Sequence, residues 1–350
     1  MKRVWTLDGL RGLAAISVVI YHGLYWHGDL LYSSAGRFAV YLFFILSAMT
    51  MMKVYAGRFS AGLDVRSLNS FYRNRVARIL PLLALVAALN FVFELLRGGN
   101  LVVEGPKAIL TATGAFGFGA AGILSNSAGA WSIGIEIVFY AVFPLVALLA
   151  HNAQLRTLIL GAVALTVLQF AHNLFVFSTY GADTYWPIYI MPISFAAYFA
   201  WGLVLGRLSP KPISFGWIGV PAILVLIWIS LVGWQSISSL LAWPGALIVP
   251  LFLSGGTYLI YCWTHPSWFI PSFRFLGEVS YSLYLLHPLV YFGLTRTFWP
   301  ANTGNVLQFV VLFVMTSLIT AWLAHHLFEK PMRRWIRSAG RSATLDKSEY

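Results

Sequence analysis

The chain has 350 residues, of which 59% are hydrophobic and only 10% are charged. Soluble globular domains carry roughly 25% charged residues, so this composition excludes a soluble protein and indicates one that spans a membrane several times. The net charge of +12 could suggest nucleic-acid binding, but the basic residues lie between apolar segments, where membrane topology places them. We therefore expect no nucleic-acid partner.

Hydropathy predicts an all-α polytopic membrane protein of about ten transmembrane helices, each able to cross about 30 Å of hydrocarbon. The predicted spans cover residues 12–28, 37–55, 79–96, 130–150, 157–178, 186–206, 214–233, 239–263, 277–297 and 306–328. The segment Lys107–Leu124 is also apolar, but its run TGAFGFGAAG is too rich in glycine to favour a helix. We expect a loop or a re-entrant segment there.

Basic residues predict the orientation. If the N-terminus is cytoplasmic and ten spans alternate, 19 of the 23 Lys and Arg residues lie on the cytoplasmic side. The four exceptions are Arg37, Arg97, Lys107 and Arg296. The positive-inside rule therefore predicts that the N- and C-termini are both cytoplasmic. We divide the chain into a transmembrane domain at 1–337 and a polar, disordered cytoplasmic tail at 338–350.

The first span carries two ionisable residues, Arg11 and His22, eleven positions apart. Eleven residues make almost three helical turns, so both side chains lie on one face, about 16 Å apart along the axis. An ionisable residue inside a membrane indicates a functional site. Two structural roles compete with this interpretation. Arg11 could anchor the helix at lipid phosphates, and His22 could be a neutral histidine bonded to a neighbouring helix.

The segment FYRNRVARILP holds Arg73, Arg75 and Arg78 on the predicted cytoplasmic side. Arg75 and Arg78 are three residues apart and share a helix face. Guanidinium groups grip phosphate in a bidentate manner, so this cluster suits a phosphorylated ligand. The alternative is that these arginines anchor the topology and bind lipid headgroups.

Two later spans are also unusually polar. Glu136 lies within an apolar helix, where a carboxylate must be neutral, paired or beside a polar cavity. The span that begins LGEVSYSLYLLHP contains Ser280, Tyr281 and His287. Small hydroxyls commonly join membrane helices, whereas His287 is the rival of His22 for the role of a base. No cysteine-rich or histidine cluster predicts a metal site.

These stretches resemble the membrane-bound acyltransferase 3 family, the sugar O-acyltransferases of bacterial envelopes. The resemblance rests on the Arg11–His22 spacing and on further motifs that occur in the family's order. The motifs are YLFFILSAM (Tyr41–Met49), FYRNRVARILP (Phe71–Pro81), WSIGIEIVFYAVFPL (Trp131–Leu145), LGEVSYSLYLLHP (Leu276–Pro288) and FEKPMRR (Phe328–Arg334). The resemblance extends from Leu7 to Arg334, with one departure at Ala48, where a glycine is usual.

The resemblance implies an O-acyltransferase of the bacterial inner membrane. It would move an acyl group, with acetyl expected, from cytoplasmic acyl-CoA to a hydroxyl of a sugar, glycan or glycoside on the far side. The implied catalytic residues are His22, as general base or acyl carrier, and Glu136, which orients or charges His22 or steers the acceptor hydroxyl. The residues implied to bind acyl-CoA are Arg11, Arg73, Arg75, Arg78, Ser280 and Tyr281. The residues implied to bind the acceptor are Trp131, Tyr140 and His287. No metal is implied, and the further partners are membrane lipids.

A second function class fits the same residues. A proton-coupled transporter or flippase of an anionic or glycosidic substrate could use Arg11, His22 and Glu136 as a proton relay. A purely structural or lipid-binding scaffold would leave the buried histidine and glutamate without a role.

Overall fold

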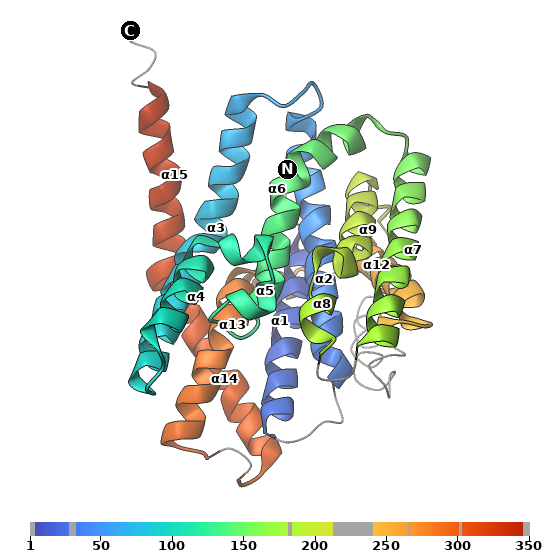
Figure 1. Cartoon of the computed structure of the whole chain (residues 1–350). Helices are drawn as coiled ribbons and strands as arrows, with labels where there is room; N and C mark the ends of the chain where they lie inside the picture. Colours follow the sequence, from blue (N-terminus) through green and yellow to red (C-terminus); the bar gives the residue numbers. More distant parts are fainter. Residues whose placement is uncertain are drawn as a thin grey trace.

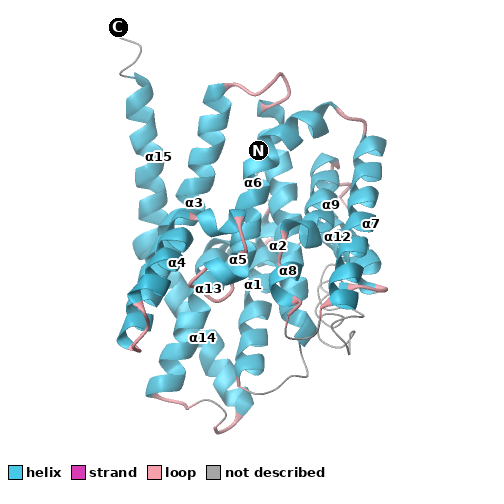
Figure 2. Ribbon diagram, in the orientation of Figure 1, coloured by secondary structure: helices cyan, strands magenta, loops and turns pink. Residues whose placement is uncertain are grey.

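The computed structural model describes residues 4–27, 33–180, 184–212, 241–264, 266–300 and 303–345. Throughout these ranges the regular elements are helices, as Figure 2 shows. The longer helices pack side by side in a bundle (Figure 1). The all-α class predicted from hydropathy is therefore confirmed for the described part of the chain.

The bounds of the elements are as follows. The α-helices are α1 (Trp5–Trp26), α2 (Ser33–Tyr55), α3 (Val65–Leu96), α4 (Leu101–Thr113), α5 (Ala121–Leu124), α6 (Ala130–Asn152), α7 (Leu155–Thr179), α8 (Trp186–Tyr189), α9 (Ala196–Arg207), α12 (Gly245–Cys262), α13 (Phe269–Thr297), α14 (Val306–Ala324) and α15 (Lys330–Leu345). Short 3-10 turns form η1 (Ala56–Arg58), η2 (Ala115–Phe118) and η3 (Pro192–Phe195), and η4 (His325–Glu329) is a π-helix.

Within the described ranges, seven helices are long and apolar enough to cross a membrane. They are Trp5–Trp26, Gly36–Arg58, Val65–Leu96, Ala130–Asn152, Leu155–Thr179, Gly245–Cys262 and Val306–Ser338. Each overlaps a predicted span, while the span predicted at 214–233 lies outside the described residues. The span predicted at 277–297 falls within α13, which has 29 residues and carries a polar motif. The total of ten spans and the side of the termini stay predictions.

One continuous helix over 186–206 is a wrong prediction. The chain forms α8, then η3, then α9. Met191 has extended backbone angles directly before Pro192. Proline disfavours a helical conformation in the residue that precedes it and cannot donate a backbone hydrogen bond itself. The apolar composition of the segment does not reveal this break.

The segment Lys107–Leu124 departs in part from expectation. Its first residues are helical, because α4 continues to Thr113. The helix ends at Gly114, whose φ of 77° is readily adopted only by glycine. The turns η2 and α5 follow, and Gly117 lies directly against the backbone of Gly134 in α6. The expectation of a loop is thus wrong before Gly114, and whether the segment is re-entrant stays a prediction.

Two helices far apart in the sequence, α1 and α13, pack in parallel and in direct contact. Gly12 of α1 lies so close to Leu276 of α13 that a Cβ on the glycine would overlap it. Likewise, Gly277 of α13 lies against Asp8 of α1. Small residues allow such close approach between membrane helices. This packing holds the helix of Arg11 and His22 beside the polar motif of α13.

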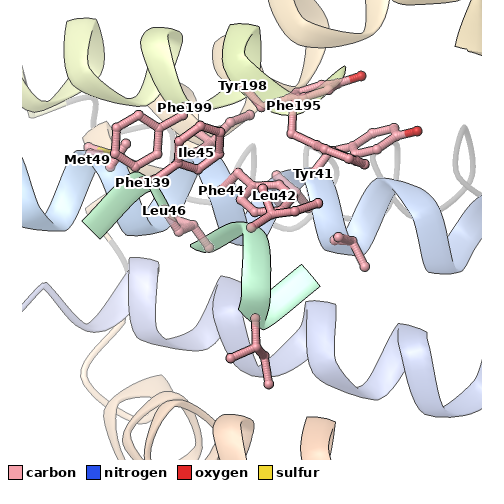
Figure 3. Packing of buried hydrophobic residues seen from close by; sticks show 14 of the residues in the cluster. Tyr41, Leu42, Phe44, Ile45, Leu46, Met49, Phe139, Phe195, Tyr198 and Phe199 are labelled. Carbon is pink, nitrogen blue, oxygen red and sulfur yellow. The ribbon is translucent and has the colours of Figure 1, made fainter. Parts of the chain in front are cut away.

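The central helix of the bundle is α2, which packs against both α1 and α9. Figure 3 shows Tyr41, Ile45 and Met49 of α2 among aromatic side chains of α6 and α9. At this interface, Gly202 of α9 lies directly against Ala48. The close approach thus uses a glycine on the partner helix, and the alanine at position 48 does not prevent it.

A buried polar cluster fastens the last helices to α13. The Glu329 carboxylate, in the π-helix η4, accepts a hydrogen bond from the Ser282 hydroxyl at 2.7 Å and pairs with His325 at 3.0 Å. His325 is therefore the partner of a carboxylate. The helix α15 then continues to Leu345, across the domain boundary predicted at 337–338. That division into a domain and a tail stays a prediction, although the backbone is helical rather than irregular through residue 345.

Candidate active site

Three adjoining cavities are lined by residues of both α1 and α2. The mouth cavity is lined by Asp8, Arg11, Lys53, Tyr55, Arg75 and Arg78, among others. The middle cavity is lined by polar residues that include Arg11, Ser47, Arg75, Arg78, Glu136, Tyr140, Ser280 and Tyr281. The aromatic cavity is lined by Tyr21, His22, Arg37, Tyr41, Trp131, Tyr185, Trp186 and Tyr189, among others.

These cavities follow one another along α1. The mouth and middle cavities share Arg11, Arg75 and Arg78, whereas the middle and aromatic cavities share Val40 and Tyr284. Arg11 and His22 thus face the same row of cavities from the two ends of one helix. Their shared face, which the eleven-residue spacing predicts, is confirmed.

The mouth cavity is strongly cationic. Arg11 forms an ion pair with Asp8 at 3.3 Å, and the Arg75 guanidinium donates to the Tyr55 hydroxyl at 3.2 Å. Arg78 has neither an ion pair nor a hydrogen bond to any described residue. Cationic groups here outnumber the carboxylates, so the cavity suits a ligand with several negative charges. Arg73 lines none of the three cavities, and the structure does not bring it together with Arg75 and Arg78.

Glu136 lies in the middle cavity and is held by two helices. It accepts hydrogen bonds from the Ser47 hydroxyl of α2 at 2.6 Å and from the Tyr140 hydroxyl, one turn further along α6. The Arg75 guanidinium lies 5.5 Å from the centroid of the Tyr140 ring. No hydrogen bond joins Glu136 to His22, and the two residues line different cavities. Direct orientation of His22 by Glu136 is therefore not observed.

Ser280 and Tyr281 present the polar motif of α13 to the middle cavity. Both hydroxyls donate to backbone carbonyls: Ser280 to Gly277 at 3.0 Å and Tyr281 to Ile79 of α3 at 2.7 Å. These bonds fix the two side chains in position. The Tyr281 bond also ties α13 to α3, the helix of the arginine motif.

His22 is directly hydrogen-bonded to His287, whose side chain is fully buried. The Nδ1 atom of His22 lies 2.8 Å from Nε2 of His287, and Nδ1 of His287 lies 3.2 Å from the Leu283 carbonyl oxygen. A carbonyl only accepts, so Nδ1 of His287 carries the hydrogen and its Nε2 must accept. His22 Nδ1 is then the donor, which leaves a lone pair on His22 Nε2.

This bond changes the role that the sequence suggested for His287. His287 does not line any of the three cavities, so direct contact with an acceptor is not supported. It lies behind His22 and fixes the tautomer and the ring orientation. Trp26 stacks on the His22 ring with centroids 4.3 Å apart, which restricts the imidazole further. Tyr284, three residues before His287, lines both the middle and the aromatic cavities.

The aromatic cavity beside His22 resembles a sugar-binding surface. Trp131 and Trp186 meet edge to face with centroids 5.3 Å apart, and the Tyr41 and Tyr189 hydroxyls are hydrogen-bonded at 2.7 Å. Aromatic faces pack on the apolar faces of pyranose rings, while protein hydroxyls form hydrogen bonds with the hydroxyl groups at the edge of the sugar ring. Trp131 lines this cavity, and its role in binding an acceptor stays a prediction, whereas Tyr140 lines the middle cavity instead.

Several functional candidates were missed by sequence reasoning. Ser47 was not distinguished from other small hydroxyls, and the bond between His22 and His287 joins residues 265 positions apart. Arg37 did carry a signal, because it is one of four basic residues on the predicted outer side. A search for metal sites in the described ranges finds no group of three His, Cys, Asp or Glu side chains that could hold an ion.

Comparisons with known proteins agree with this geometry. The family described as an acyltransferase domain matches residues 4–325. The YrhL protein of Bacillus subtilis, provisionally named a peptidoglycan O-acetyltransferase, is 26% identical and aligns with 93% of this chain and 54% of its own length. The O-acetyltransferase OatA of Staphylococcus aureus is 23% identical, over 94% of this chain and 57% of OatA.

A third relative is the peptidoglycan O-acetyltransferase OatA of Listeria monocytogenes, which is 25% identical over 95% of this chain and 56% of that protein. The chain thus spans a little over half the length of the curated relatives it matches. No solved structure matches the chain significantly.

Proposed function

The chain belongs to the acyltransferase domain family, and on that premise we propose that it is an integral membrane O-acyltransferase that acts on a glycan. The observation that carries this proposal is the position of His22. His22, whose Nδ1 is bonded to His287, lines an aromatic pocket that adjoins a row of cavities beginning at four cationic side chains. A donor with negative charges and a sugar acceptor can thus approach the same imidazole from two sides.

The donor in this proposal is acyl-CoA, with acetyl as the expected acyl group. Arg75 and Arg78, with Arg11 nearby, would hold its phosphates in the mouth cavity. Ser280 and Tyr281 would line the channel toward His22. Acyl-CoA supplies the acyl group as an activated thioester, which no side chain of the protein can supply. The charge of the cavity fits this donor, since Arg78 has no partner among the described residues and Asp8 is the single carboxylate among the described residues that line the cavity.

His22 can serve acyl transfer in two ways. As a general base, Nε2 takes the proton of the acceptor hydroxyl while the hydroxyl oxygen attacks the acyl carbon; the thioester C–S bond then breaks, and the proton passes from His22 to the departing CoA thiolate. As a nucleophile, Nε2 bonds to the acyl carbon while the C–S bond breaks and CoA thiolate leaves. The hydroxyl oxygen then attacks the acyl carbon, the C–N bond breaks, and the hydroxyl proton passes to the freed Nε2. In both cases His287 stabilises the positive charge that develops on the His22 ring, through the Nδ1–H bond. Glu136 would act on the donor side, among the arginines.

The acceptor in this proposal is a glycan of the peptidoglycan class. Relatives named for that activity support it, and the aromatic cavity supports a sugar ring beside His22. Other envelope polysaccharides, lipid-linked sugars and glycosides share this chemistry. The distribution of basic residues supports cytoplasmic termini in the bacterial inner membrane, with the donor inside and the acceptor outside.

The test uses purified protein in nanodiscs, with radiolabelled acetyl-CoA and soluble peptidoglycan fragments. We expect free CoA to be released only when protein and fragments are both present, and mass spectrometry to find an O-acetyl ester on the sugar. A transporter would consume no acetyl-CoA and would instead move a solute in sealed vesicles. The absence of ester with every glycan class tried would contradict the proposal.

A further inference from the structure

One charged side chain of the aromatic cavity has no role in the chemistry described so far. Arg37 lies in the second turn of α2, next to Gly36, and lines the cavity together with His22. Gly36 allows this placement, because a Cβ there would overlap the ring of Tyr21. The first turns of α2 thus bring a guanidinium to the cavity that His22 also lines.

No described residue supplies a counter-charge to Arg37. It forms no ion pair or hydrogen bond with any described residue, and the described lining of the cavity contains no Asp or Glu. The polar groups of the residues that line the same cavity include the hydroxyls of Tyr41, Tyr185 and Tyr189. Two of these, on Tyr41 and Tyr189, already bond to each other. A cation that is removed from water is costly unless an anion completes the site.

We propose that Arg37 binds a carboxylate or phosphate group of the acceptor, so that the acceptor of this chain is an anionic glycan. This inference rests on the proposed function, and it narrows the substrate class. The aromatic rings would pack on the apolar face of the sugar, while the Arg37 guanidinium would donate hydrogen bonds to two oxygens of the anion. Because Arg37 and His22 line one cavity, the anion would also fix which hydroxyl faces Nε2.

The test measures equilibrium binding, so it does not depend on turnover. The purified protein is placed in nanodiscs of neutral phosphatidylcholine and titrated with two pairs of probes. One pair is N-acetylmuramic acid and its carboxyl methyl ester, and the other is N-acetylglucosamine 6-phosphate and N-acetylglucosamine. We expect at least one charged probe to bind about tenfold tighter than its neutral counterpart, since charge-assisted bidentate bonds are the strong ones.

Variants then assign the preference to Arg37. Arg37→Gln should bind the charged and neutral probes of the pair equally, and Arg37→Lys should retain part of the preference. The matched control is Arg97→Gln, which removes an outer arginine that is paired with Glu94 and lines none of the three cavities. It should keep the full preference. Thermal unfolding of each variant checks that the protein is folded.

Two results would overturn the inference. One is equal affinity for the charged and neutral probes of both pairs in the unmodified protein. The other is an Arg37→Gln protein that keeps the charge preference. If Arg37→Gln instead only loses co-purifying phosphatidylglycerol, Arg37 serves a lipid headgroup and the inference is wrong. Failure of the proposed function looks different, because acetyl-CoA would stay unconsumed while the Arg37-dependent binding persisted.

Discussion

The Nδ1 atom of His22 lies 2.8 Å from the Nε2 atom of His287. This bond joins α1 to α13, the two helices that approach closely at Gly12 and Gly277. Since His287 donates its own Nδ1 hydrogen to the Leu283 carbonyl, the direction of both bonds is set. His22 is thereby held as the tautomer whose Nε2 can accept a proton or an acyl group.

The first prediction concerns this pair. His287→Ala should lower kcat about tenfold or more, because the lost hydrogen bond frees the His22 ring and removes its support for positive charge. His287→Gln should recover part of the rate, since its side-chain oxygen can accept from His22 Nδ1. KM for acyl-CoA should not change in either variant. Steady-state kinetics measures both constants, and a His287→Ala protein with unchanged kcat would mean that the pair is only structural.

The second prediction separates the arginines of one motif. Changing Arg75 and Arg78 to Ala should weaken acyl-CoA binding and raise its KM, because each change removes a contact to phosphate. Lys at both positions should rescue only in part, since it lacks the planar fork. The control is Arg73→Ala, which alters the same helix outside the three cavities and should leave donor affinity unchanged. Equal donor affinity in the folded double variant and the control would assign all three arginines to topology.

The third prediction concerns the contact between α1 and α13. Gly12→Ala forces a methyl group into the backbone of Leu276, so it should destabilise the protein by about 1–3 kcal/mol. Gly161→Ala, in α7, is the matched control, because nothing lies within 4 Å of its added Cβ. That change should be neutral or slightly stabilising. Thermal unfolding in detergent compares the two, and equal melting temperatures would contradict the close packing.

The fourth prediction concerns the membrane side of the cavities. A reporter fused after Tyr350 should be active in the cytoplasm, and one inserted at Gly304, between α13 and α14, should be active outside. The reason is the excess of basic residues on the predicted inner side. Reporter activity and cysteine labelling of intact cells measure the two positions. A C-terminal reporter active only outside would reverse the side assigned to acyl-CoA.

The local pattern of the sequence predicts much of this site, because helical spacing decides which residues share a face. Arg11 and His22 face one row of cavities for that reason, and so do Arg75 and Arg78. The same rule would have left Arg73 outside the donor site. Most apolar runs of sufficient length are indeed helices, since a helix satisfies the backbone hydrogen bonds that the membrane interior cannot.

The features that escaped prediction depend on contacts between distant segments. Spacing within one helix cannot show that His287 lies behind His22, because that bond requires the register of α1 against α13. Similarly, Glu136 finds Ser47 on another helix rather than His22. Pro192 does indicate a break in the helix predicted over 186–206. The prediction rested instead on the apolar composition of the whole segment, which does not reveal the break. In the sequence, Arg37 stands out only as an exception to the positive-inside rule. A cation without a partner among the described residues is, however, itself a sign of an anionic ligand.

The most direct test of the central claim replaces His22 with glutamine. Gln can form hydrogen bonds, but it can neither take up a proton at neutral pH nor carry an acyl group. We expect His22→Gln to bind acyl-CoA normally and to lose transfer to the glycan by a factor of about 10²–10⁴ or more. His326→Gln, at an exposed histidine outside the three cavities, should transfer at the normal rate. Transfer by His22→Gln at a rate close to that of the unmodified protein would contradict the account.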